Sequence, residues 1–207
     1  SVSSLVTNMK IDINSRISLS NNDGGIGNTV FGYAAGVSLA SGGNYNIILG
    51  HGAGNALTTG VNNVAIGKDA LVAGTTETDD NVAIGFNAMG GAIGTEVVND
   101  CVAIGSGSLA GALDSTNGID EASGTVAIGK SALAALTTGT GNVAVGFSAL
   151  DADVGGDKST AVGYEALTAQ TGVTGEVSNT AIGYSAGKAI QAGIKNVIIG
   201  SNAAIVA

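Results

Sequence analysis

The chain has 207 residues, enough for one ordinary domain, with 35 glycines, no proline and a formal net charge of −9. A surface this acidic repels nucleic acid, and aromatic residues, at 3%, are too few to stack on single strands. Abundant glycine without proline, together with 44% apolar residues, excludes a collagen-like or disordered chain and favours thin layers stacked many times.

Residues 1–26 do not fit the pattern that follows them, although Ile11, Ile13, Ile17 and Leu19 indicate strand alternation. We interpret 1–26 as an N-terminal cap or connector and 27–207 as one repeat domain. The chain begins at Ser1 without an initiator methionine, and we expect it to be a segment of a longer protein. No apolar run approaches the roughly 20 residues that span a membrane, so we predict no membrane insertion.

From residue 28 onward one short motif occurs ten times. Each copy has an opening residue, usually Asn, then three residues that are mostly small or β-branched and a glycine, as in residues 63–67, Asn-Val-Ala-Ile-Gly. Three residues after the glycine comes an alanine, which Ser108 replaces in one copy. These repeat glycines are the structural site residues that we predict: Gly32, Gly50, Gly67, Gly85, Gly105, Gly129, Gly146, Gly163, Gly183 and Gly200.

Each position of the motif has a physical interpretation. The short β-branched run favours a strand, in which Val64 and Ile66 share one face while Ala65 points to the other. We expect the bulky face to fill the interior of each coil and the alanine face to lie against another backbone layer. The glycine permits a turn with positive φ, or a close approach that a Cβ would block. The asparagine is expected to close a turn or to stack on the asparagine of the next coil.

The stretch after each glycine supplies a second apolar patch, as at Ala70-Leu71 and Ala149-Leu150. One copy buries too little surface to stand alone, whereas stacked copies share a continuous core. The sequence therefore predicts an all-β fold, a parallel β-solenoid or β-roll of about ten coils, on the order of 48 Å long at about 4.8 Å per strand. The longest polar connections, at 90–100, 110–124 and 168–178, are expected to emerge on one side.

Residues 124–131, Gly-Thr-Val-Ala-Ile-Gly-Lys-Ser, match the pattern of a phosphate-binding loop. In such a loop the four intervening residues cradle phosphate with their backbone amides, after a strand and before a helix. Alignment with the other nine copies makes these four residues a strand instead. We therefore predict no nucleotide binding.

The acidic stretches are candidate metal or catalytic sites. Residues 151–157 have the carboxylate density of a calcium loop, but Gly155 and Val162 stand where oxygen ligands are required. A solvated turn is the favoured interpretation. Glu77, Asp79 and Asp80 form a second cluster without an ordering signal, and neighbours in one loop do not define the fixed separation that glycoside hydrolysis needs. We predict no metal, no cofactor and no catalytic residue.

Two single residues and one repeat position are further candidates for a functional role. His51, the single histidine, has no Cys or second His nearby, which argues against a metal or catalytic role. Cys101, the single cysteine, replaces the usual Asn and is expected to be a small buried residue. The position after the repeat glycine is expected to face solvent or a neighbouring chain, with an aromatic ladder for glycan contact as an alternative. Its aromatic members are Tyr33, Phe86, Phe147, Tyr164 and Tyr184, and Lys68, Ser106 and Lys130 break the ladder.

The core Asn-Val-Ala-Ile-Gly-x-x-Ala, as at residues 81–88, resembles the repeat of trimeric autotransporter adhesin heads, in which three chains form parallel left-handed β-rolls around a shared axis. It resembles still more the related repeats of bacteriophage tail fibres. Residues 14–25, Asn-Ser-Arg-Ile-Ser-Leu-Ser-Asn-Asn-Asp-Gly-Gly, resemble the start of such fibre regions. The likeness covers roughly residues 14–204. It implies a left-handed homotrimer that is a shaft or receptor-contacting rod of a tail fibre, on the virion or an extracellular surface.

Physical reasoning agrees with a homotrimer, because a lone coil stack exposes a long apolar strip that three copies around an axis would bury. The expected partners are therefore further copies of the chain and a host cell-surface glycan or protein. Two other functions stay open at this stage. One is a bacterial trimeric surface adhesin head with the same coil, and the other is a glycan depolymerase tailspike, which needs carboxylates fixed in a groove.

Overall fold

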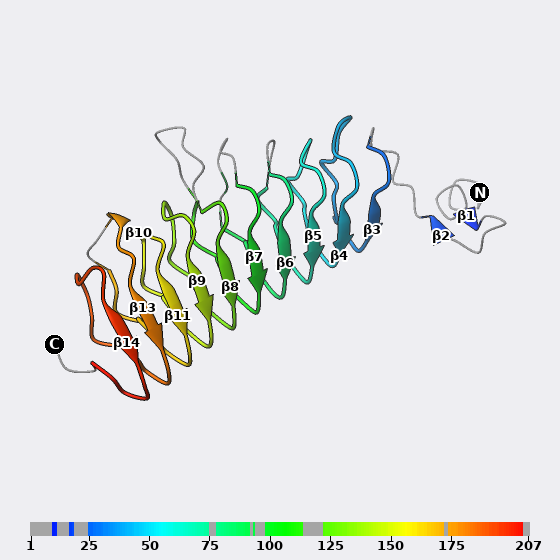
Figure 1. Cartoon of the computed structure of the whole chain (residues 1–207). Coiled ribbons are helices and arrows are strands. Elements are labelled where there is room, and N and C mark those ends of the chain that lie inside the picture. Colours follow the sequence, from blue (N-terminus) through cyan, green and yellow to red (C-terminus); the bar gives the residue numbers. More distant parts are fainter. Residues whose placement is uncertain are drawn as a thin grey trace.

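The computed structural model shows a β-solenoid in which the ten repeats supply one strand each to a single parallel sheet (Figure 1). It describes residues 25–74, 78–91, 93, 98–113, 122–171 and 174–204, together with two short strands at 10–11 and 17–18. These residues form strands, turns and bends and no helix, so the predicted all-β parallel solenoid is confirmed. In chain order the sheet contains β3 (Thr29–Phe31), β4 (Ile47–Leu49), β5 (Val64–Ile66), β6 (Val82–Ile84), β7 (Val102–Ile104), β8 (Val126–Ile128), β9 (Val143–Val145), β11 (Thr160–Val162), β13 (Thr180–Ile182) and β14 (Val197–Ile199).

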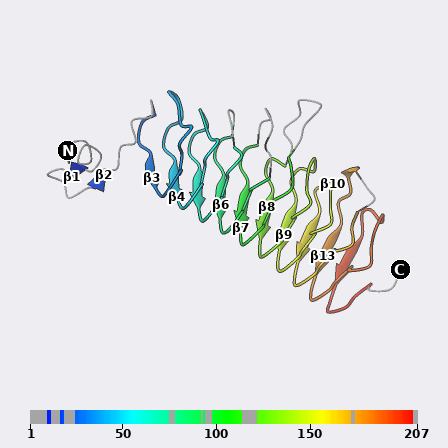
Figure 2. The same ribbon diagram turned by 180° about the vertical axis from the view of Figure 1, so that it is seen from behind.

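All strands of this sheet pair in one register, so that equivalent repeat positions lie on top of one another. Between β5 and β6, for example, Val64 pairs with Val82 and Ala65 with Ala83. The return legs that join consecutive strands are stacked in the same order, as the view from behind shows (Figure 2). Each repeat position therefore forms a column that runs along the solenoid.

The repeat glycines stand where the chain leaves the sheet, and the geometry there excludes a side chain for two reasons. All ten have φ between +127° and +142°, a region that side chains rarely adopt. A Cβ on Gly129 would lie 2.3 Å from the carbonyl oxygen of Gly146 in the next coil. The other repeat glycines that have a following coil meet its glycine in the same way. The turn and the close approach are thus both present.

After the glycine, a second hydrogen-bonded ladder ties each coil to both neighbours. The backbone N–H of Leu133 donates to the carbonyl oxygen of Ala149 in the next coil, and that of Ser131 to the carbonyl oxygen of Ser106 in the preceding coil, both at 3.0 Å. Ser131 and Leu133 have φ of 58° and 51°. In these left-handed conformations the amide of Ser131 points to the preceding coil and that of Leu133 to the next coil. The backbone groups of the turn therefore have hydrogen-bond partners in both neighbouring coils.

The interior is filled by the alanine face of the sheet and by leucines of the return legs. Ala65 and Leu71 are both fully buried, whereas Val64 and Ile66 are partly exposed on the outer face. The expectation that the bulky strand face fills the interior is therefore wrong. The physical reason is that the return leg brings Leu71 into the coil, and close packing leaves room for only a small side chain at the centre of the strand.

Large and small side chains exchange places across this interior. Where the centre of the strand is Ile48, the position usually held by leucine is Gly54, and a Cβ there would lie 3.1 Å from Cδ1 of Ile48. A Cβ on Gly36 of the preceding coil would meet the same Cδ1 atom at 3.1 Å. In the sixth coil the sizes are reversed, with Ala127 and Leu133 both fully buried. The total side-chain volume in the interior is kept, while the residue that supplies it changes from the strand to the return leg. Core substitutions that conserve volume are the ones that proteins tolerate best.

We expect Ala127→Ile to lower the free energy of unfolding by about 1–3 kcal/mol, because Leu133 already fills the space that the added atoms need. Combining it with Leu133→Gly copies the arrangement of Ile48 and Gly54. The double variant is expected to be at least about 1 kcal/mol more stable than the sum of the two single changes predicts. Urea unfolding of the wild type and the three variants measures this coupling, and strictly additive effects would contradict the exchange.

The remaining strands lie outside the main sheet. β1 (Lys10–Ile11) and β2 (Ile17–Ser18) pair antiparallel, whereas Ile13, Leu19 and most of the N-terminal segment lie outside the described residues. β10 (Gly155–Asp157) and β12 (Thr174–Glu176) pair in parallel within the connections that follow β9 and β11. Residues 94–97, 114–121 and 172–173 are also outside the described part, so the one-sided arrangement of the longest connections stays a prediction.

Candidate functional site

A buried ladder of asparagine side chains runs along the solenoid just before the strands. Oδ1 of Asn63 accepts hydrogen bonds from the backbone N–H and the side-chain amide of Asn81, at 3.1 and 3.2 Å. Nδ2 of Asn63 donates to Oδ1 of Asn46 at 3.1 Å and to the carbonyl oxygen of Thr78 at 2.6 Å. Asn46, Asn63 and Asn81 are fully buried. The expected stacking of asparagines is present, and each amide joins two coils.

Cys101 takes one rung of this ladder. Its backbone N–H donates to Oδ1 of Asn81 at 3.0 Å, and its Sγ lies 2.9 Å from the carbonyl oxygen of Ala122, where other coils place the side-chain amide. Cys101 is fully buried, and burial raises the pKa of its thiol to about 11. A thiol that stays protonated and shielded from solvent is a structural group rather than a nucleophile.

Towards the C-terminal coils, a chain of buried amides ends on a carboxylate. Nδ2 of Asn179 donates to Oε1 of Gln170 at 2.8 Å, and Nε2 of Gln170 donates to Oδ2 of Asp153 at 2.7 Å. Oδ1 of Asp153 accepts the backbone N–H of Gly156 at 2.9 Å. Asp153 is only 1% exposed. The interpretation of residues 151–157 as a solvated turn is therefore wrong for Asp153, which is the final acceptor of an internal network.

Sequence reasoning missed this network, although a signal was available. Asp153 and Gln170 each stand seven residues after a repeat glycine, in consecutive copies. In most other copies the same position is aliphatic, as at Leu57, Leu136 and Ile190. Two polar residues that replace aliphatic ones in adjacent coils satisfy each other, which removes the penalty of burying either alone.

Burial raises the pKa of the Asp153 carboxyl above its ordinary value of 3.8, against smaller opposing effects of hydrogen bonds from Gly156 and Gln170. The unfolded chain then loses this proton at lower pH than the folded chain, so ionisation favours unfolding. The stability linked to Asp153 is present below pH 3.8 and is lost as the pH rises through the folded pKa. Asp153→Asn does not ionise at this position. As the pH rises from about 3 to about 7, we therefore expect the free energy of unfolding of the variant, measured with urea, to increase relative to that of the wild type. A relative loss over that range would contradict this.

The phosphate-loop pattern at residues 124–131 is occupied by strand β8. The backbone N–H of Val126 donates to the carbonyl oxygen of Asn142 at 2.8 Å, and that of Gly129 to the carbonyl oxygen of Ile104 at 2.7 Å. These amides are committed to the two neighbouring coils. They therefore do not converge on a common point as amides that bind a phosphate do.

The described acidic residues near the middle of the chain also connect coils. Oδ1 of Asp79 accepts the backbone N–H of Val61 at 2.8 Å, and Oδ1 of Asp80 accepts the side-chain amide of Asn62 at 3.0 Å. Glu77, the third member of the predicted cluster, lies outside the described residues. Within the described ranges, no three His, Cys, Asp or Glu residues are grouped as metal ligands would be.

The residues directly after the repeat glycines form a stacked column, here called the aromatic column. Phe147 and Tyr164 have ring centroids 4.9 Å apart with planes 11° from parallel, and Tyr164 and Tyr184 have centroids 5.5 Å apart at 15°. Rings stacked in this way cover one another's faces and present their edges to solvent. Contact between a glycan and an open ring face is therefore limited to places where the column is interrupted.

The N-terminal half of the aromatic column continues with other residue types. Tyr33 stacks on His51, with centroids 5.2 Å apart, and Nζ of Lys68 lies 5.2 Å from the ring centroid of Phe86. Tyr33 and Phe86 are 78% and 54% exposed, as expected for a solvent-facing position. The column is broken at Ser106, which has no ring or long side chain.

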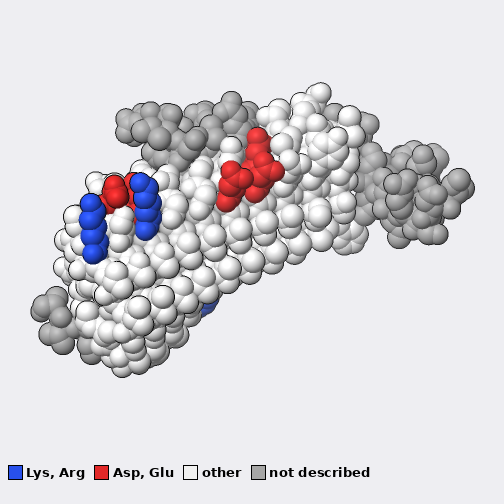
Figure 3. Space-filling model, in the orientation of Figure 1, with Lys and Arg blue, Asp and Glu red and all other residues white. Residues whose placement is uncertain are grey.

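One side of the sheet, called here the outer face, carries two columns made by the first and third residues of each strand. They are mainly aliphatic, with Thr29, Thr160, Thr180 and Phe31 as the exceptions. In β7 the two outward residues are Val102 and Ile104, and no outward strand position is charged. The part of the molecule that carries the strands in Figure 1 is almost free of charged side chains in Figure 3, and the charged side chains seen in that view lie mainly above the strands. Ten strands at about 4.8 Å, with about 7 Å between the two outward residues of each, give a strip of roughly 340 Å², within the range of the largest patches seen on monomers.

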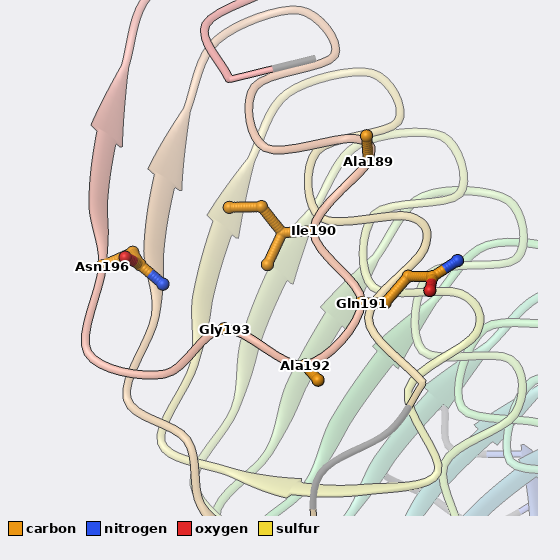
Figure 4. A pocket seen from close by; sticks show the side chains of 6 residues that line it. All are labelled: Ala189, Ile190, Gln191, Ala192, Gly193 and Asn196. Atoms are coloured by element: carbon orange, nitrogen blue, oxygen red, sulfur yellow. The ribbon is translucent and has the colours of Figure 1, made fainter. Parts of the chain in front are cut away.

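A hollow of about 470 Å³ lies at the return leg that joins β13 and β14 (Figure 4). The side chain of Ile190 points between the return leg and the strands, and it packs against the core. The hollow is therefore a continuation of the solenoid interior rather than a pocket with convergent polar groups. Its lining residues are Ala189, Ile190, Gln191, Ala192, Gly193 and Asn196.

The described part of the chain contains no helix of the length and hydrophobicity that a membrane crossing requires. In comparisons with family models, with curated proteins and with solved structures, nothing matched the chain.

Proposed function

We propose that the chain is a left-handed, homotrimeric structural and adhesive segment of a bacteriophage tail fibre, a shaft or receptor-contacting rod on the virion. The outer face is the observation that carries this proposal. Burying it against further copies removes from water an apolar surface whose end positions, such as Ile199, are 68% exposed. The number of copies, the handedness and the assignment to a phage fibre rest on the resemblance of the repeat.

The way in which the coils are joined suits a mechanical role. The backbones of the strands and of the return legs form hydrogen bonds between neighbouring coils of the described solenoid. The asparagine ladder adds side-chain hydrogen bonds between most of these coils. Pulling two coils apart therefore breaks several bonds at once, in addition to exposing the shared core. A rod built in this way carries load along its length and holds its exposed residues at regular intervals, which favours multivalent attachment.

Light scattering of the purified chain tests the assembly. We expect a mass three times the chain mass of 19.8 kDa. Ile104→Lys places a charge on the outer face and is expected to give single chains with unchanged β-sheet circular dichroism, because an uncompensated buried charge is strongly unfavourable. Ser106→Lys, in the same coil but at a position where two repeats carry Lys, is the matched control and should keep the wild-type mass. Single chains for the wild type would overturn the homotrimer.

Labelling with antibodies raised against the chain tests its location. Label on the fibres of virus particles supports the tail-fibre assignment. Label on the surface of uninfected bacteria would replace it with the adhesin head, the alternative that shares the coil.

The proposal assigns no catalysis to the chain. The carboxylates of Asp79, Asp80 and Asp153 accept hydrogen bonds from the protein, which gives them a structural use. Incubation with host polysaccharide is therefore expected to leave the polymer length unchanged. The appearance of shortened oligosaccharides would assign the depolymerase function instead.

A further inference from the structure

The aromatic column is interrupted at Ser106, and we propose that this interruption binds a pyranose ring that carries a carboxylate, as an acidic unit of a cell-surface glycan. The inference deepens the receptor-contacting role proposed above. It rests on that role for the source of the sugar and not for the binding itself.

The spacing of the column leaves room for one ring. Neighbouring members lie one strand spacing apart, about 4.8 Å, so Phe86 and Lys130, on either side of Ser106, are about 10 Å apart along the solenoid. Elsewhere one ring fills such a distance, because Tyr164 stacks on both of its neighbours with centroids 4.9 and 5.5 Å away. A bound ring of similar thickness would restore the column at Ser106.

The residues beneath the interruption are small. Ser106 is exposed, and no atom lies within 4 Å of the place where a Cβ on Gly107 would stand. A ring that enters between the two flanking side chains therefore meets no obstruction from the turn. The hydroxyl of Ser106 lies at the base of this space, where it can exchange hydrogen bonds with a sugar hydroxyl.

Phe86 supplies the stacking surface. One side of its ring is covered by Lys68, whose Nζ lies 5.2 Å from the centroid. Lys68 belongs to the preceding coil and Ser106 to the following one, so the side of the ring that faces Ser106 has only a serine beside it, and Phe86 is 54% exposed. The C–H face of a pyranose complements the negative face of an aromatic ring.

Lys130 supplies the charge that selects an acidic sugar. Its Nζ lies 5.8 Å from the ring centroid of Phe147, and it forms no ion pair with any described residue. Lys68, the other lysine near the interruption, is paired with Asp69 at 2.6 Å. Phe147 lies in the coil after Lys130 and Ser106 in the coil before it, so the amine turns back along the column to donate a charge-assisted hydrogen bond to a carboxylate on the bound ring, and no described carboxylate holds it in place.

Saturation-transfer NMR on the purified chain, with methyl β-glucuronide and methyl β-glucoside, tests the inference, because these sugars differ at the carboxylate. We expect transfer to the ring protons of the glucuronide and about tenfold weaker binding of the glucoside, as the loss of one charge-assisted hydrogen bond implies. Ser106→Tyr, which supplies the ring that three other copies carry, should abolish binding while the fold is kept. Lys130→Gln should reduce glucuronide binding to the level of the glucoside.

Ser201→Tyr is the matched control, since it adds the same ring to the same column at the last coil and should leave binding unchanged. The inference is overturned if neither sugar shows transfer or if Ser106→Tyr binds as the wild type does. Equal binding of both sugars overturns the acidic assignment. The result is independent of the mass measurement: a trimer that binds no sugar overturns only this inference, and single chains that bind it overturn only the homotrimer.

Discussion

Gly129→Ala is expected to lower the free energy of unfolding by about 4 kcal/mol or more and to separate the sheet between β8 and β9. The added Cβ would lie 2.3 Å from the carbonyl oxygen of Gly146, and φ at this residue is +132°. Relief requires moving backbone atoms that strand hydrogen bonds fix on both sides. Urea unfolding measures the loss, and faster amide hydrogen exchange in β8 and β9 than in β4 and β5 locates it.

Gly107→Asn is the control for this change. It replaces another glycine with positive φ, +66°, but no atom lies within 4 Å of the added Cβ. The equivalent residue of the preceding coil is already Asn87, at φ 54°. We expect a change within about 0.5 kcal/mol. Equal destabilisation by the two substitutions would show that the close approach of coils is not what makes the repeat glycines necessary.

Asn63→Leu is expected to cost about 3–5 kcal/mol, because at similar side-chain volume it leaves buried hydrogen-bonding groups without partners. The carbonyl oxygen of Thr78 loses its donor, and the backbone N–H and side-chain amide of Asn81 lose their acceptor. Chemical denaturation of both proteins measures the difference in the free energy of unfolding.

Asn62→Lys provides the comparison for the ladder substitution. Asn62 is the adjacent residue, exposed and at φ 59°, and two equivalent residues are Lys158 and Lys195, at φ 58° and 57°. A change of less than about 1 kcal/mol is expected at this surface position. If Asn63→Leu is as mild as Asn62→Lys, the buried asparagines contribute little to holding the coils together.

The strands and their order could be predicted from the sequence because they depend on local requirements that recur. A side-chain period of two, a glycine at each exit from the sheet and stacking of like repeats define ten strands and their pairing. The conformation of Leu133 could not be predicted in this way. Its φ of 51° lies in a region that leucine disfavours, and it is held there by burial and by a hydrogen bond to Ala149 in the next coil.

The choice of the inner strand face needed information from a second segment. Alternation distinguishes Ala127 from its neighbours in the strand but does not say which face the return leg covers. The sequence holds that information in the opposite sizes of residues such as Ile48 and Gly54, which become interpretable once the two segments are known to face each other. The candidate binding position at Ser106 could be predicted only in part for a similar reason. The aromatic column is visible in the sequence, but which ring faces are covered depends on side-chain geometry.

The uniform register has a consequence for how such a chain changes over generations. Excision of residues 86–105 would bring Gly85 next to Gly129. Gly85 would then approach the carbonyl group of Gly129 as it now approaches that of Gly105. Duplication of one such stretch would likewise create only junctions that already exist in the molecule. The reach of the rod is therefore adjustable in steps of about 4.8 Å by unequal recombination, without the invention of a new interface.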